Sequence, residues 1–383
     1  MKNRKIMILN LGSTSFKFKL YQIEKDKAEE EQCLEIVQGQ TENVGDYLEA
    51  FENCLKELEQ SGILHSMGEL DAVGYKSVHA GAISGARIID GEVLTVMEHY
   101  SDYAPAHNPV YIRLMRQVRE KWPGLLQIGC FETSFHVDIP LKRAVYGVPD
   151  DWREQLGIRR YGFHGASHSY IAWRMSREDR TAQKVISVHL GGSSSLCAIE
   201  NGKSIASSMG ATPQSGLFQN NRVGDFDIFC LSALMKYYGG DFRKILDVLS
   251  RESGLLGLSG VSNDLRQVLL AAENGNQRAQ LAIDAFVDNI AGYIGMFQTY
   301  LKGLDCLVFT GGIGFNSNYI RSRVCQEISF LGISLDMEKN LSGREGKISI
   351  EESRIGVYVF KTDEELMVMR QCLKILAENE NRK

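Results

Sequence analysis

The sequence predicts an α/β protein made of two related domains, and two similar glycine turns are the main reason. Between residues 6 and 20, an apolar run enters a turn of small and hydroxyl-bearing residues, and a run of alternating apolar and basic residues leaves it. This pattern is typical of a β-hairpin. Residues 189–191 take the place of residues 10–12 in a second such unit, 179 positions later (189 minus 10). The repeat indicates a duplication, and 383 residues are enough for about two domains.

Both turns have the composition of a phosphate-binding loop. Gly12 allows a sharp turn and a close approach of the backbone to a ligand, and the hydroxyl and N–H groups beside it can cradle a phosphate. The first hairpin alone is also compatible with an ordinary polar turn, but its second copy favours a nucleotide site. Two phosphate-facing hairpins across a cleft are typical of the duplicated ribonuclease-H-like fold of actin, Hsp70 and sugar kinases. We therefore expect this two-domain fold, with the active site in an interdomain cleft.

Composition narrows the class of protein. A hydrophobic content of 44% with 24% charged residues is typical of a soluble globular protein. A net charge of −5 without a long basic run argues against nucleic acid or a membrane surface as partner. We expect neither a cleavable leader nor a membrane span. The eight cysteines form no CxxC pair, which argues against a zinc or redox motif and for reduced thiols in the cytoplasm.

The first half alternates helical and strand patterns. Apolar residues at helical spacing predict a helix over residues 46–60. Residues 72–81 have the pattern of a strand that ends in a glycine turn, and residues 126–130 that of a short buried strand. The second strand delivers the segment 131–136 to its carboxyl end.

Two polar segments are expected to lead into helices. Residues 104–109 form a loop from which Asn108 caps a helix that runs to about Lys121. Residues 159–168 open the second half and lead into a helix that runs to about Met175.

Beyond Phe226 the chain is expected to be mostly helical. A glycine- and serine-rich loop is predicted at 255–264, followed by two helices that fill about 264–302. A buried strand at 306–310 then runs into a glycine turn, and another helix begins near Ser317.

The last helix is expected to return to the first domain. Glu364 and Glu365 open it, as acidic residues commonly do in a first helical turn. We therefore expect an N-terminal domain of residues 1–150, completed by the C-terminal helix 366–383, and a C-terminal nucleotide-binding domain of residues 151–365.

Seven segments, in fixed order over nearly the whole chain, carry a family resemblance. They are residues 10–18, 104–109, 131–136, 159–168, 259–266, 309–317 and 362–366. Together they resemble the motifs of the acetate kinase family, which belongs to the acetate and sugar kinase, Hsp70 and actin superfamily. The family's R-R-Y-G-F-H-G-T-S-H, for example, matches residues 159–168 with one change.

The resemblance implies an activity and its cofactors. It implies reversible transfer of the ATP γ-phosphoryl group to the carboxylate of acetate or a similar short-chain acid, which gives an acyl phosphate and ADP. It also implies Mg²⁺, for which Mn²⁺ can substitute, and a cytoplasmic homodimer.

Three catalytic residues follow from the resemblance: Glu132, His164 and Arg222. Phosphoryl transfer needs aligned reactants and donors around the equatorial oxygens. The guanidinium fork of Arg222 and the imidazole of His164 suit that task. The ordinary alternatives are a surface salt bridge for the arginine and a satisfied core position for the histidine.

The same resemblance assigns binding residues. The metal-associated pair is Asn10 and Glu364, although acidic residues in a first helical turn have an ordinary explanation in the helix dipole. The acid would be bound by Lys76, Val78, Ala106, His107, Phe163 and Pro213. The nucleotide would be bound by Ser13, Ser15, Lys17, His189, Gly191, Gly192, Asp264, Leu265, Arg266, Gly312, Gly314, Asn316 and Ile320.

Several positions depart from the family pattern. Lys76 stands where the family has an arginine, Glu132 where it has an aspartate, and Gly192 where it has an asparagine. Lysine keeps the charge but loses bidentate geometry. Asn220 also replaces a glycine near the phosphates, and Ala106 replaces a leucine, so the pocket has room for a longer acid such as propionate.

These departures keep two alternatives open. The chain is either a carboxylate kinase with a retuned site or a weakened, repurposed relative that binds nucleotide. Sugar phosphorylation is a further alternative within the superfamily, against which the acetate-type motifs and the small apolar acid pocket argue.

Overall fold

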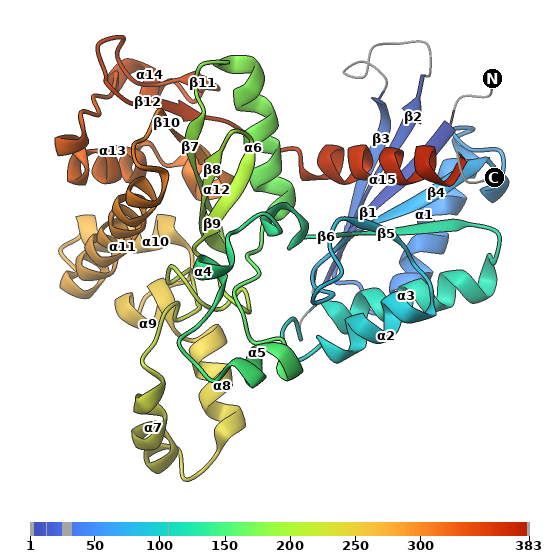
Figure 1. Ribbon diagram of the computed structural model, residues 1–383, viewed down its shortest axis with the longest axis horizontal. Helices are drawn as coiled ribbons and strands as arrows, with labels where there is room; N and C mark the ends of the chain where they lie inside the picture. The colour runs from blue at the N-terminus through green and yellow to red at the C-terminus, as the bar shows by residue number, and fades with distance from the viewer. Residues whose placement is uncertain (1–3, 13, 25–32, 106, 381–383) are drawn as a thin grey trace. The chain divides into compact units, whose positions relative to one another are not determined.

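The computed structural model describes residues 4–12, 14–24, 33–105 and 107–380, and these form two compact units (Figure 1). Unit 1 comprises the chain up to Phe135 together with the segment from Asp363 onward, and unit 2 comprises His136–Thr362. The division lies 15 residues before the expected boundary at 150 (150 minus 135). His136 belongs to unit 2 because its ring is hydrogen-bonded to Ser204 and to the carbonyl of Phe163.

Unit 1 is built on a six-stranded sheet of order β3-β2-β1-β4-β6-β5. β1 pairs antiparallel with β2 and parallel with β4, which in turn pairs parallel with β6. The strands are β1 (Arg4–Leu11), β2 (Ser15–Ile23), β3 (Cys33–Glu42), β4 (Leu70–Ser77), β5 (Ala86–Ile88) and β6 (Leu126–Phe131). The helices are α1 (Tyr47–Gln60), η1 (Met67–Glu69), α2 (Gly91–His99), α3 (Asn108–Lys121), η2 (Ser134–His136, which reaches into unit 2) and α15 (Glu364–Glu380).

Helices cover both faces of this sheet (Figure 1). Met7 and Leu9 share one buried cluster with Phe51 of α1 and Leu114 of α3. α15 covers the other face and contacts β1, β4, β5 and β6. Period-two alternation along β1 separates the two sets of side chains.

Unit 2 repeats this plan with a sheet of order β11-β12-β10-β7-β8-β9. β7 pairs antiparallel with β8 and parallel with β10, and β10 pairs parallel with β12. These are the relations of β1 to β2, β4 and β6, so the predicted duplication and the two-domain α/β class are confirmed. The strands are β7 (Lys184–Leu190), β8 (Ser194–Glu200), β9 (Lys203–Ser207), β10 (Cys306–Thr310), β11 (Gly346–Lys347) and β12 (Gly356–Val359).

The helices of unit 2 pack on its sheet from two sides. Ile186, Val188 and Leu190 of β7 enter the core that α11 fills, and the intervening Ser187 and His189 face α6. The helices are α4 (Leu141–Ala144), α5 (Asp150–Leu156), α6 (Gly165–Glu178), η3 (Ile228–Cys230), α7 (Leu231–Tyr237), α8 (Phe242–Arg251), α9 (Gly254–Ser259), α10 (Leu265–Glu273), α11 (Gln277–Leu301), α12 (Gly311–Asn316), α13 (Asn318–Glu327), η4 (Ser329–Leu331) and α14 (Met337–Leu341).

Three local predictions are wrong. Asn108 does not cap α3, because its buried amide donates to the carbonyls of His79 (2.8 Å) and Met97 (2.9 Å) and so ties the loop after β4 to helix α2. The predicted loop at 255–264 contains the short helix α9, which buries Leu255. The glycine turn expected after β10 is instead the short helix α12. The helix expected near Ser317 is present as α13, which Ser317 caps.

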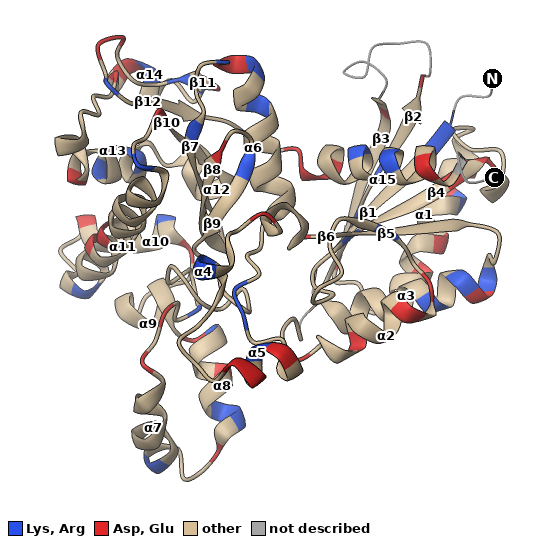
Figure 2. Cartoon of the chain, viewed as in Figure 1, with Lys and Arg blue, Asp and Glu red and all other residues tan. Residues whose placement is uncertain are grey.

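Lysine and arginine are interspersed with aspartate and glutamate over both units (Figure 2). None of the helices in the described ranges is long and apolar enough to cross a membrane.

Candidate functional site

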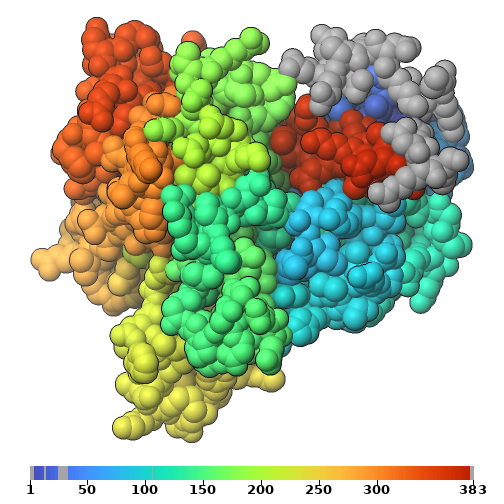
Figure 3. Space-filling model, viewed as in Figure 1, coloured from blue at the N-terminus to red at the C-terminus, as the bar shows by residue number. Residues whose placement is uncertain are grey.

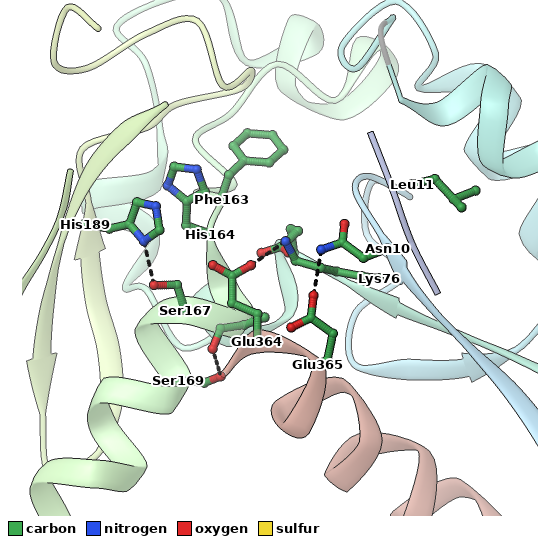
Figure 4. A network of polar contacts seen from close by, with 12 residues as sticks. Asn10, Leu11, Lys76, Phe163, His164, Ser167, Ser169, His189, Glu364 and Glu365 are labelled. Atoms are coloured by element: carbon green, nitrogen blue, oxygen red, sulfur yellow. Dashed lines mark hydrogen bonds and ion pairs between the residues drawn. The ribbon is translucent and has the colours of Figure 1, made fainter. Parts of the chain in front are cut away.

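Unit 1 gathers a charged cluster at the carboxyl ends of its parallel strands. Lys76 lies near the end of β4, Asn10 near the end of β1, and Glu132 directly follows β6. Glu364 and Glu365, in the first turn of α15, join them (Figure 4). Parallel neighbours end at the same edge of a sheet, which is why residues so far apart in sequence meet here.

The lysine of this cluster is held between two carboxylates. Its Nζ lies 3.2 Å from Oε1 of Glu132 and forms a second ion pair with Glu364. Burial alone would lower the pKa of Lys76, but the neighbouring Glu364 and Glu132 outweigh it and hold the pKa well above its usual value. The ammonium therefore stays charged at any working pH.

The two expected metal residues have different partners. Asn10 donates from Nδ2 to Oε1 of Glu365 at 2.8 Å, whereas Glu364 pairs with Lys76. The acidic residue beside Asn10 is thus Glu365, which the sequence motif alone did not single out. An amide and carboxylates are oxygen ligands of the type that Mg²⁺ prefers, so this donor set fits the metal. Among the described residues, no group of three or more His, Cys, Asp or Glu side chains is placed to hold a metal ion.

The remaining site residues expected in unit 1 are less tightly placed. Val78 is half-buried against the core, and His107 precedes α3 with its side chain partly exposed. In the turn after β1, Ser15 accepts a backbone hydrogen bond from Gly12, and Lys17 is exposed. Ala106 and Ser13 lie outside the described residues.

Unit 2 holds a cluster of histidines around the start of α6. His164 directly precedes the helix and adopts a left-handed backbone conformation with φ of 56°. Such a conformation costs a residue with a side chain about 1–2 kcal/mol, so it marks a position that the surrounding structure fixes. The His164 ring stacks on His189 of β7, with centroids 4.4 Å apart (Figure 4).

Serine hydroxyls orient these rings. Nδ1 of His164 lies 2.8 Å from Oγ of Ser195, and Nδ1 of His189 lies 2.7 Å from Oγ of Ser167. Behind them, His168 is fully buried. Burial, followed by the neighbouring His136 and His189, holds the pKa of His168 well below its usual value, so this ring is neutral.

Arg222 is a partly buried cation that contacts neutral groups. Its Nη1 donates to Oγ of Ser193 (3.1 Å), the carbonyl of Pro213 (3.3 Å) and Oε1 of Gln219 (3.3 Å). Burial lowers its pKa. Within the described ranges no carboxylate forms an ion pair with this guanidinium or contributes to its pKa, which leaves its charge available for an anionic ligand.

A pocket of about 660 Å³ in unit 2 has the size of a small-molecule site. The predicted nucleotide residues among its lining are Gly191, Gly192, Asp264, Leu265, Arg266, Gly312 and Asn316. The glycine turns approach closely, since a Cβ on Gly191 would lie 3.9 Å from the backbone nitrogen of Gly312.

Two nucleotide predictions fall behind this pocket. Ile320 is fully buried in the core that includes Val324, and Gly314 is buried beside the carbonyl of Val188. The side chain of Arg266 is 89% exposed and forms an ion pair with Asp264. The other residues around the pocket therefore do not fix its position.

The structure adds residues that the sequence motifs did not indicate. Tyr319, Leu269 and Asn263 line the nucleotide-sized pocket, and their neighbours in sequence, 264–266 and 316–317, were the available signal. Ser195 and Ser187 contact the histidines because the pleat of β7 and β8 turns them toward α6. Phe163, expected at the acid, is buried, and its carbonyl is bonded to His136.

The fold and these clusters define a class of protein, namely two-unit α/β proteins of the acetate and sugar kinase type. The chain itself belongs to the acetokinase family, whose model matches residues 5–370. The predicted family is therefore confirmed.

Relatives and solved structures agree with this membership. An acetate kinase of Carboxydothermus hydrogenoformans is 36% identical over 402 residues, which cover 97% of this chain and 99% of that protein. The crystal structure of Porphyromonas gingivalis acetate kinase superposes with a TM-score of 0.86 at 35% identity, covering 97% of this chain and all of the other (100%). That of a propionate kinase from Francisella tularensis subsp. tularensis gives 0.87 at 32% identity, covering 96% and 98%.

Proposed function

We propose that this chain is an acetate kinase-type phosphotransferase. It would transfer the γ-phosphoryl group of ATP reversibly to the carboxylate of acetate or a similar short-chain acid, giving an acyl phosphate and ADP. The observation that carries the proposal is that Arg222, an uncompensated cation, lies in the unit that also contains the histidine cluster and the nucleotide-sized pocket. Membership of the acetokinase family over residues 5–370 supports the reaction type.

Unit 2 would bind the nucleotide and stabilise the moving phosphoryl group. The adenosine would occupy the pocket beside Asp264 and Leu265, and the phosphates would meet the backbone N–H groups of the glycine turns. Arg222 and His164 would donate hydrogen bonds to the equatorial oxygens, over which the charge is spread in the transition state. Both groups cost little reorganisation because neighbouring side chains already hold them.

Unit 1 would supply the groups for the acid and the metal. Lys76 would attract the carboxylate, with Glu132 fixing the position of the ammonium. Asn10, Glu364 and Glu365 would hold Mg²⁺, which supplies charge neutralisation for the phosphates when bound. The role of Ser15 and Lys17 would be to contact phosphate oxygens from the turn after β1.

The test is a hydroxamate-trapping assay with ATP, Mg²⁺ and each acid from formate to butyrate. We expect an acyl phosphate from acetate, from propionate, or from both. A folded protein that forms no acyl phosphate with any of these acids contradicts the proposal.

A weakened relative that binds nucleotide is the second candidate, and one observation favours it. Lys76 is engaged by two carboxylates, whereas an acid substrate needs its charge. This candidate predicts ATP binding by calorimetry without product in the trapping assay.

We also propose a cytoplasmic homodimer. The location is supported by the cysteines, since all eight are free thiols, as expected in a reducing compartment. The segment from η3 through α7 to α8, yellow in Figure 3, exposes large apolar side chains, with Phe229 of η3 87% and Tyr237 of α7 80% accessible. Light scattering of the purified chain tests the dimer, and a Phe229→Glu variant should favour the monomer if this surface is the contact.

A further inference from the structure

Four histidine rings of unit 2 each contact a serine hydroxyl in the same way. In each case Nδ1 of the ring lies within hydrogen-bond distance of a serine Oγ. The pairs are His136 with Ser204 (2.8 Å), His164 with Ser195 (2.8 Å), His168 with Ser187 (2.9 Å) and His189 with Ser167 (2.7 Å). The proton of a neutral imidazole is on one nitrogen only, so the direction of each serine contact decides which ring nitrogen carries the proton.

The tautomer of His136 follows directly from its second partner. Its Nε2 lies 2.9 Å from the carbonyl oxygen of Phe163, which can only accept, so Nε2 carries the proton. Burial lowers the pKa of His136 to about 4, so the ring is neutral and its Nδ1 accepts from Ser204. The thiol of Cys197 donates to the same serine oxygen at 3.2 Å. These contacts form one arm of the hydrogen-bond network. This arm fixes the carbonyl of Phe163, which immediately precedes His164.

A second, longer arm reaches the ring of His164. Oγ of Ser195 lies 2.8 Å from Nδ1 of His164 and 2.9 Å from Nε2 of His168. Nδ1 of His168 lies 2.9 Å from Oγ of the fully buried Ser187. A hydroxyl has one hydrogen to donate, so the order of donors along this arm is restricted.

One order satisfies every group in the arm. Ser187 donates to Nδ1 of His168, Nε2 of His168 donates to Ser195, and Ser195 donates to Nδ1 of His164. In the reverse order the buried hydroxyl hydrogen of Ser187 has no acceptor among the described residues, and buried donors are rarely left unpaired. The neutral state of His168 agrees with the first order, since a neutral ring has one donor and one acceptor nitrogen.

We propose that Ser195 and His168 are positioning residues that hold His164 as the tautomer protonated on Nε2, with Nδ1 accepting from Ser195. A neutral His164 then presents a fixed N–H donor for an anionic oxygen and needs no protonation to act. The identity of that oxygen, on a transferred phosphoryl group, rests on the proposed function. The tautomer itself does not.

The first experiment reads the tautomer without any assay of activity. In protein labelled with ¹⁵N-histidine at about pH 8, where an ordinary imidazole is neutral, long-range ¹H–¹⁵N correlation distinguishes a protonated from a bare ring nitrogen. The His164 signals are assigned by their loss in His164→Gln. We expect a protonated Nε2 and a bare Nδ1, and in Ser195→Ala a shift toward the average of two exchanging tautomers. Ser176→Ala, which changes an exposed serine of α6, should leave the signals unchanged.

The second experiment compares two replacements of His168. The amide nitrogen of Gln can occupy the place of Nε2 and donate to Ser195, whereas Leu cannot. We expect His168→Gln to keep kcat within about threefold and His168→Leu to lower it about 10–100-fold, because one transition-state donor loses its orientation. KM for ATP should change less than about threefold in both, since the donor acts on the reaction and not on nucleotide binding.

Three outcomes overturn the proposal. They are a protonated Nδ1 on His164 in the unsubstituted chain, an unchanged tautomer in Ser195→Ala, and equal kcat losses in His168→Gln and His168→Leu with both variants folded. If the chain proves to lack kinase activity, the proposed function fails while the tautomer measurement still decides this inference.

Discussion

Lys76 shows at the scale of one residue how this chain departs from its family pattern. The family motif has arginine here, and the sequence indicates only a loss of bidentate geometry. The structure adds that the ammonium is shared between Glu132 and Glu364, and Glu132 is itself a lengthened form of the family's aspartate. In this chain the shorter cation and the longer carboxylate form an ion pair with each other.

Removing this cation should mainly weaken binding of the acid. Lys76→Met removes the ammonium that would attract the carboxylate of the acid, so we expect KM for the acid to rise about 10-fold or more. Lys76→Arg keeps the charge and should have a smaller effect. Lys56→Met, at an exposed lysine of α1, is the matched control and should behave as the unsubstituted chain. Steady-state kinetics with varied acid measure this, and an unchanged KM in Lys76→Met would exclude the role.

Arg222 should act on kcat. Arg222→Ala removes a guanidinium that Ser193, Pro213 and Gln219 hold in place, and we expect kcat to fall about 100–1,000-fold. Arg222→Lys should recover little, because a single ammonium cannot reproduce the fork. Arg180→Ala, at an exposed arginine, serves as the control. Kinetics that show a large change in KM for ATP with kcat preserved would instead make Arg222 a nucleotide-binding group.

At the scale of elements, helix α15 depends on a glycine that the sequence did not mark. Gly74 of β4 lies under this helix, and a Cβ there would come within 2.5 Å of Sγ of Cys372 and 2.7 Å of Cδ1 of Ile8. The helix can therefore lie close to the sheet, which brings Glu364 and Glu365 to the strand ends. Helix periodicity predicted that α15 exists, but only the packing shows what positions it.

Filling this contact should destabilise unit 1. Gly74→Val introduces a branched side chain into a fully packed layer, and we expect a loss of about 1–3 kcal/mol in the free energy of unfolding. Because α15 carries Glu364, activity should fall as well. Gly124→Ala is the control, since nothing lies within 4 Å of a Cβ at that position. Urea unfolding followed by circular dichroism measures the loss, and equal midpoints for the two variants would contradict this account.

Element types were more predictable than the contacts between them. The two hairpins, the strands at 126–130 and 306–310 and the helices after residue 264 follow from periodicity and turn residues alone. Asn108 is a counterexample, because its amide makes tertiary contacts to the loop after β4 and to helix α2, and no local sequence pattern reveals these contacts. The serine contacts of the histidines are of the same kind, since they depend on which face of β7 and β8 meets α6.

At the scale of the whole molecule, the duplication predicted from two turns is seen in the strand order of the two sheets. Both have a central strand with an antiparallel neighbour on one side and two parallel strands on the other. Buried titratable groups are nevertheless distributed differently. His136 and His168, whose pKa values are lowered by burial, both belong to unit 2.

Acid should therefore destabilise the protein through unit 2. His136 has a pKa of about 4 in the folded chain and about 6.5 when unfolded, so between these values the unfolded state binds more protons. Stability consequently falls as the pH is lowered through this window, and a difference of about 2.5 pH units corresponds to about 3 kcal/mol. His136→Gln, whose amide can still donate to the carbonyl of Phe163, should flatten the pH dependence of the urea midpoint, whereas His65→Gln, at an exposed histidine, should leave it intact. The same slope in His136→Gln as in the unsubstituted chain would place the acid-sensitive group elsewhere.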